Sequence, residues 1–182
     1  MKHVLPLLLV LAGVTAFGQS PRAVELFGTF GAMRGGGDEG SEGSGGLYGG
    51  AATVPFAARW AVDVQALTSR LSDSPSFRLR RVLFSPGLQY RRGNGSALWF
   101  VAFGPGLERD RTSGAYHVYD SAGGARTVRF DESRAGLTLH WRTGAVFQPT
   151  SRLLVRGEFF WVNRYVLPSI GAAISVGVRL GR

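Results

Sequence analysis

Residues 152–182, RLLVRGEFFWVNRYVLPSIGAAISVGVRLGR, decide the fold class of this chain. The stretch reads as two strands joined by a short loop, and side chains alternate along each strand. From position 153 the odd residues are apolar or glycine up to Trp161, and the even residues between them include Arg156 and Glu158. A period of two residues puts apolar side chains on one face and glycine or charged side chains on the other. Strands of about ten residues with this pattern fit the wall of a barrel that crosses a bilayer.

The rest of the chain has the same organisation. Turn signals divide it into further alternating segments, and after the first residues no segment of similar length has a helical period. We predict an all-β fold, an eight-stranded antiparallel up-and-down transmembrane β-barrel. Alternation leaves the facing of the second and fifth strands open. The predicted strands are residues 24–33, 46–54, 59–69, 77–90, 97–109, 135–148, 152–163 and 170–180.

The connections between these strands alternate in length. The tight turns, rich in Pro, Gly, Asn or Ser, are 55–58, 91–96 and 149–151. The other connections are 34–45, 71–76, 111–133 and 164–169, of which 34–45 and 111–133 are long, polar and rich in glycine. Short periplasmic turns that alternate with longer external loops are typical of outer-membrane barrels. The pattern therefore predicts that the barrel begins in the periplasm.

Residues 1–18 have the pattern of a cleavable secretory signal. A short positive start precedes an apolar run that is too short for a spanning helix, and small residues precede Gln19. Cleavage after Ala16 is the alternative. We expect residues 19–182 to form one outer-membrane β-barrel domain. The chain has no Cys, which excludes disulfides and lipoprotein anchoring.

The basic residues are scattered along the chain. The formal net charge is +9, and every Lys or Arg after Lys2 is an arginine. These arginines occur singly along strands and at strand ends, so we expect no nucleic-acid partner.

Charged residues on the inward parity predict a packed ionic core. An eight-stranded barrel has an interior just wide enough for side chains to fill, so charges there must pair or retain water. The alternative is a narrow pore, gated when an arginine changes its carboxylate partner. The residues expected in the lumen are Glu25, Asp63, Gln65, Arg81, His140, Arg142, Arg156, Glu158 and Arg179.

A second set of arginines falls near the external rim. An arginine fork suits phosphate, and the outer leaflet carries lipid phosphates. The hypothesis is contact with lipopolysaccharide through Arg78, Arg80, Arg109 and Arg111, and the alternative is solvated loop charge. The whole set is Arg34, Arg70, Arg78, Arg80, Arg109, Arg111, Arg134 and Arg164.

Three segments resemble the small eight-stranded outer-membrane barrels of the OmpA/OmpX/opacity-protein group. They are ELFGTFGAM (25–33), LWFVAFGPGLER (98–109) and RTGAVFQPTSRLLVRGEFFWV (142–162). The resemblance implies a porin-like monomer in the outer membrane of a Gram-negative envelope, folded by the barrel-assembly machinery, without cofactor or metal. The chain departs from this group by ending in Leu180, Gly181 and Arg182, where the group usually closes on an aromatic residue.

The function we expect is non-enzymatic, structural or adhesin-like. The predicted contact surface is segment 111–133, which contains Tyr116, His117, Tyr119 and Phe130.

Two rival classes stay open. A few small barrels modify lipid A, and His117, Asp120 and Ser121 would be the candidate residues here, but no recognised signature surrounds them. A secreted, lipocalin-like barrel would show the same alternation. The alternating loop lengths, the aromatic residues near strand ends and the strongly charged face favour the membrane barrel.

Overall fold

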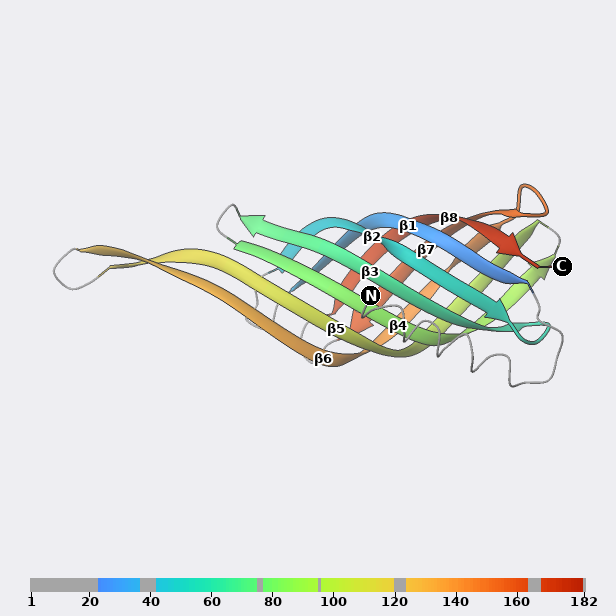
Figure 1. Cartoon of the computed structure of the whole chain (residues 1–182), viewed down its shortest axis with the longest axis horizontal. Helices are drawn as coiled ribbons and strands as arrows, with labels where there is room; N and C mark the ends of the chain where they lie inside the picture. The colour runs from blue at the N-terminus through green and yellow to red at the C-terminus, as the bar shows by residue number, and fades with distance from the viewer. Residues whose placement is uncertain are drawn as a thin grey trace.

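The computed structural model describes residues 23–36, 42–74, 77–94, 96–119, 124–163 and 168–181. They form a closed barrel of eight antiparallel strands, in which each strand pairs with its neighbours in the sequence and β1 pairs with β8 (Figure 1). The strands are β1 (Val24–Gly36), β2 (Glu42–Pro55), β3 (Trp60–Ser74), β4 (Phe77–Asn94), β5 (Ala97–Tyr119), β6 (Ala125–Phe147), β7 (Leu153–Asn163) and β8 (Ser169–Leu180). The predicted signal sequence, residues 1–18, lies outside the described residues.

The described part of the chain contains no helix that is long and apolar enough to cross a membrane.

The two ends of the barrel differ. At one end, tight turns join β2 to β3, β4 to β5 and β6 to β7, as the sequence predicts, and β1 begins there opposite the end of β8. At the other end, β5 and β6 project beyond the remaining strands (Figure 1). In outer-membrane barrels the tight turns lie on the periplasmic side.

The wall is inverted relative to a soluble protein. Along β7, Arg156 and Glu158 are buried, whereas Phe159 and Trp161 are 69% and 53% exposed. The exposed apolar side chains form a belt around the outside of the barrel, and charged side chains fill the lumen. The second and fifth strands, whose facing the sequence does not decide, follow the same rule. Tyr48 on β2 and Phe103 on β5 are exposed on the outside of the barrel.

The structure corrects the prediction of a long loop at residues 111–133. β5 runs to Tyr119 and β6 begins at Ala125, and the two strands pair without interruption from Ala97↔Phe147 to Tyr119↔Ala125. Beyond the apolar belt water can solvate both faces of a strand, so this segment lacks the alternation that marks a membrane strand. The other long connection is also shorter than predicted, since β1 extends to Gly36 and β2 begins at Glu42.

Apolar side chains occupy the lumen between the charged groups. The larger cluster is at the outer end and includes Leu71, Leu79 and Phe160. The smaller cluster is nearer the tight turns and includes Phe27, Phe100 and Leu154. The interior is therefore a sequence of ionic and apolar layers that fill the barrel.

Candidate functional site

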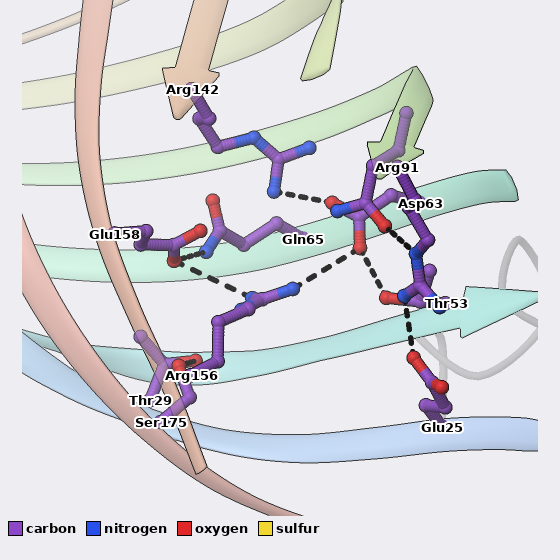
Figure 2. Close-up of polar contacts among 11 residues, drawn as sticks. Glu25, Thr29, Thr53, Asp63, Gln65, Arg91, Arg142, Arg156, Glu158 and Ser175 are labelled. Atoms are coloured by element: carbon purple, nitrogen blue, oxygen red, sulfur yellow. Dashed lines mark hydrogen bonds and ion pairs between the residues drawn. The ribbon is translucent and has the colours of Figure 1, made fainter. Parts of the chain in front are cut away.

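The centre of the lumen is an ion-pair network around Asp63 (Figure 2). The Asp63 carboxylate, fully buried, lies 2.5 Å from Nη1 of Arg142 and 3.3 Å from Nη1 of Arg156. The Thr53 hydroxyl donates a hydrogen bond of 2.6 Å to the same carboxylate. Three strands thus direct donors at one acid, which offsets the cost of burying its charge.

Arg156 connects this acid to a second one. Its Nη2 donates to Glu158 Oε1 at 3.4 Å, and Gln65 donates to the same oxygen at 2.6 Å. The guanidinium lies over the rings of Phe27 and Phe100, at 4.5 Å and 5.8 Å from their centroids. Cation–π contact and ion pairing therefore hold Arg156 between an apolar cluster and two carboxylates.

A second network lies nearer the tight turns. The Glu25 carboxylate accepts from Arg91 at 2.5 Å and from Arg179 at 2.8 Å. Each arginine also donates to a side-chain amide oxygen, Arg91 to Gln89 and Arg179 to Gln148. One carboxylate thus serves two guanidinium groups.

A third network lies toward the outer end. Arg81 is 3.0 Å from Glu108 and 2.9 Å from Asp110, and it also donates to the Ser169 hydroxyl at 2.5 Å. The arginine, on β4, thus connects the neighbouring strand β5 to β8 on the other side of the lumen.

The charged residues that the sequence predicts for the lumen all lie on its inner face, Arg179 being partly exposed at its end. His140 is buried there beside Gly87, whose missing side chain makes room for the imidazole, because a Cβ on Gly87 would lie 2.9 Å from Nε2.

Sequence reasoning missed three charged lumen residues, Arg91, Glu108 and Asp110. Arg91 falls in a predicted turn that the structure shows to be strand. Glu108 and Asp110 lie on the strand whose facing stayed open. Placing Leu107 outward would have identified both acids, because they share the opposite parity.

The predicted rim arginines lie at the outer edge of the apolar belt. Arg34, Arg80 and Arg109 are each the first exposed side chain beyond the belt on β1, β4 and β5. Register places Arg80 between Arg70 and Arg111 on the neighbouring strands, with all three exposed.

Some rim arginines are paired on the hairpin. Arg111 donates to both carboxylate oxygens of Asp131, and Arg134 is 3.2 Å from Glu132. Arg78 is exposed one step farther out than Arg80, and Arg164 lies outside the described residues.

Of the residues considered for lipid A chemistry, His117 lies in the described part of the chain. His117 is exposed on the hairpin, where Nδ1 lies 3.1 Å from the Thr127 hydroxyl. Asp120 and Ser121 lie outside the described residues. Among the residues described, no cluster of three or more His, Cys, Asp or Glu side chains could hold a metal ion.

The sequence matches no protein-family model and no curated protein. Solved structures match the fold. Ail, the attachment invasion locus protein of Yersinia pestis, aligns with a TM-score of 0.59 at 14% identity, covering 89% of this chain and 100% of Ail. Ail bound to the heparin analogue sucrose octasulfate aligns with a TM-score of 0.56 at 15% identity and the same coverage.

Two further barrels align equally well. Neisserial surface protein A gives a TM-score of 0.60 at 13% identity, covering 86% of this chain and 96% of that protein. The N-terminal β-barrel domain of Pseudomonas aeruginosa OprF gives 0.55 at 14% identity, covering 89% and 100%. The chain therefore has the fold of the eight-stranded outer-membrane β-barrels, and the prediction of its fold class is confirmed. The outward apolar belt is the face that such a barrel presents to the outer membrane.

Proposed function

We propose that this chain is a non-enzymatic, integral outer-membrane protein that contacts partners outside the cell through its β5–β6 hairpin. The observation that carries the proposal is the open edge of this hairpin. Pairing between β4 and β5 ends at Phe77↔Gly114, and pairing between β6 and β7 begins only at Leu139↔Asn163. Residues 125–138 of β6 therefore have no strand beside their outer edge among the described residues. Such an edge can pair with an extended segment of another chain.

One face of the hairpin adds to this surface. The face on the lumen side has Tyr116, Val118, Val128 and Phe130, with the rings of Tyr116 and Phe130 6.2 Å apart. Apolar side chains this far beyond the belt are exposed to water, and exposed apolar patches mark interaction sites. Ail, whose name refers to attachment, has the same barrel fold.

Deleting the outer hairpin tests the proposal. Residues 115–129 are removed, and Gly114 is joined to Phe130 by an Asn-Gly turn, which suits a hairpin connection. We expect the shortened barrel to keep heat-modifiable gel mobility, because every lumen ion pair remains. Cells that display it should lose attachment to host-cell monolayers and to immobilised heparin. Attachment at the full-length level by a folded, shortened barrel would contradict the proposal.

A matched substitution separates the hairpin face from its length. Tyr116→Ser with Phe130→Ser keeps the strands and removes the apolar patch. We expect reduced attachment, because the exposed apolar patch is part of the proposed contact surface. Thr127→Ser on the opposite face should attach like the unaltered protein.

We also propose that the arginines at the outer edge of the belt bind lipopolysaccharide phosphates. They form a collar that includes Arg70, Arg78, Arg80, Arg109 and Arg111. Like charges directly opposite one another on paired strands are destabilising, yet Arg70 and Arg80 lie opposite each other. Neither makes an ion pair with another described residue. A phosphate between the two guanidinium groups would remove the repulsion and accept their forked hydrogen bonds.

Co-purification of lipopolysaccharide tests the second proposal. Changing Arg78, Arg80, Arg109 and Arg111 together to Gln should reduce the lipid that purifies with the barrel. Arg126→Gln with Arg129→Gln is the control, because both arginines lie on the hairpin beyond the collar. Equal lipid in all three preparations would refute the role of the collar.

The filled lumen favours a closed barrel over a narrow pore. Two buried apolar clusters and paired arginines occupy the interior. We expect purified protein in a planar bilayer to give a flat current baseline across voltages and salt concentrations, and discrete openings would support the pore instead.

A further inference from the structure

A cavity of about 640 Å³ lies at the tight-turn end of the barrel. It lies between the turn that joins β2 to β3 and the end of the β4–β5 hairpin. Its position is opposite to the collar and to the projecting hairpin, so neither proposed function uses it. The residues that matter for its chemistry are Pro55, Arg59, Arg91, Arg92, Leu98 and Trp99.

Backbone hydrogen bonds hold the two walls of the cavity together. The N–H of Arg91 donates to the carbonyl of Arg59 at 2.8 Å, which fixes the β2–β3 turn against the end of β4. Within that turn, the N–H groups of Phe56 and Ala57 donate to the Trp60 carbonyl at 3.1 Å and 3.2 Å. The arginines of both walls are thus positioned by paired backbone rather than by a free loop.

The cavity has an excess of positive charge. Arg91 at its back is held by Glu25 (Figure 2). That carboxylate also pairs with Arg179, so the group of three side chains carries one more positive charge than negative. Arg59 and Arg92 are exposed on the two walls and form no ion pair with another described residue. None of the described residues that line the cavity is Asp or Glu. An anion would therefore meet several cations and no opposing acid.

One wall is apolar and aromatic. Trp99 is 45% exposed and lies opposite Arg92 on the paired strand. Its ring is 6.0 Å from that of Tyr90, which is 5.2 Å from Trp60, and both contacts are edge-to-face. Trp and Tyr gather where lipid headgroups meet the hydrocarbon, so this row marks the periplasmic interface of the membrane. The cavity is then at the depth of the lipid phosphates of the inner leaflet.

We propose that this cavity binds the phosphodiester headgroup of an anionic glycerophospholipid from the periplasm-facing leaflet. Arg59 and Arg92 donate forked hydrogen bonds to the phosphate oxygens, and Trp99 contacts the glycerol and the start of the acyl chains. A soluble phosphate would satisfy the arginines alone, but it would leave the apolar wall uncovered. The lipid covers both.

Lipid retention measured by native mass spectrometry tests the proposal. The barrel is released from bilayers that mix phosphatidylglycerol with phosphatidylcholine, and the bound lipids are identified. The wild-type barrel should retain phosphatidylglycerol preferentially. Arg59→Gln with Arg92→Gln should weaken that retention at least about tenfold, since each lost charged hydrogen bond is worth about 1.5 kcal/mol or more.

Two controls define the site. Arg152→Gln removes an exposed arginine at the same end of the barrel that does not line the cavity, and it should retain lipid like the wild type. Trp99→Ala keeps the cations and removes the apolar wall, and it should also weaken retention. A second arm titrates the detergent-solubilised barrel with glycerol phosphate and follows the backbone amides of Gly93 and Leu98.

The outcomes separate the two sources of phosphate. Selective loss of phosphatidylglycerol from the double variant, with Arg152→Gln unchanged, supports the proposal. Equal retention by all barrels would overturn it. Saturable amide shifts with glycerol phosphate, together with no lipid difference, would assign the cavity to soluble phosphates and overturn the lipid as occupant. Heat-modifiable mobility of each variant shows that its barrel is folded.

Discussion

Arg142 with Asp63 in the lumen and Arg111 with Asp131 on the hairpin join the same two functional groups in different surroundings. Each pair has a nitrogen–oxygen distance of 2.5 Å. The lumen side chains are 1% and 0% exposed, whereas the hairpin side chains are 65% and 52% exposed. The buried pair has no water to replace a lost partner, and the exposed pair has water on every side. Removing one partner should therefore destabilise the barrel much more in the buried pair than in the exposed pair, although the two pairs have the same distance.

The largest effect is expected from Asp63→Asn. The substitution keeps the size of the side chain and removes the charge that faces both Arg142 and Arg156. An uncompensated buried arginine typically costs about 3–5 kcal/mol. Reversible urea unfolding of the barrel in lipid vesicles, followed by tryptophan fluorescence, measures the change. An unfolding free energy within about 1 kcal/mol of wild type would show that water reaches the lumen freely. The buried and exposed pairs would then not differ in their effect on stability.

The next effect concerns close packing on the two faces of the wall. A Cβ on inward-facing Gly144 would lie 2.1 Å from the Gly157 carbonyl oxygen, whereas a Cβ on Gly157 itself would meet nothing within 4 Å. Gly144→Ala should therefore cost about 1–3 kcal/mol through displaced backbone. Gly157→Ala is the matched control and should leave the urea midpoint unchanged. Similar losses in both variants would mean that the two faces are equally crowded.

The sequence was sufficient for the wall and much of the lumen. Wherever lipid covers the outer face of a strand, side chains alternate between the lumen and the lipid. The odd or even position of a residue was therefore enough to identify Glu25, Arg81 and Arg156 as lumen residues. Their partners could not be predicted in the same way. Glu25 meets Arg91 because two hairpins bring distant strands across the lumen, and that contact depends on register along the whole barrel.

The hairpin was the part that sequence reasoning missed. Its outer residues pair as regular strands, but Arg111, Asp131 and their neighbours face water on both sides. Because neither face of this segment is covered, its side chains need not alternate. Its glycine and polar residues therefore give it the composition of a loop. Water on both sides of the hairpin explains both its missing alternation and the small expected effect of its ion pair. The lumen and the lipid constrain side chains in a way that water does not.

A double variant tests whether the loss of stability in Asp63→Asn comes from the unpaired arginine that it leaves in the lumen. In Asp63→Leu with Arg142→Met both charges of the closest pair are removed, and Arg156 still has Glu158. Replacing a buried pair by apolar side chains is often neutral, so unfolding free energy should return to within about 1 kcal/mol of wild type. A loss as large as that of Asp63→Asn would instead indicate that the intact pair itself stabilises the barrel.

The smallest effect is expected from Asp131→Asn on the hairpin, beyond the apolar belt. The hydrogen bonds from Arg111 hold the pKa of the Asp131 carboxyl below its ordinary value of 3.8, so any stabilisation is complete above that value and is lost only as the pH falls through the lowered pKa. At neutral pH the substitution should leave the urea midpoint unchanged, because water solvates the released guanidinium. Carbon NMR of the Asp131 carboxyl should show the lowered titration, and Arg111→Gln should return it toward 3.8. A midpoint shift like that of Asp63→Asn would mean that the hairpin and the lumen form one cooperative unit, since only then could a solvated pair be as important as a buried one.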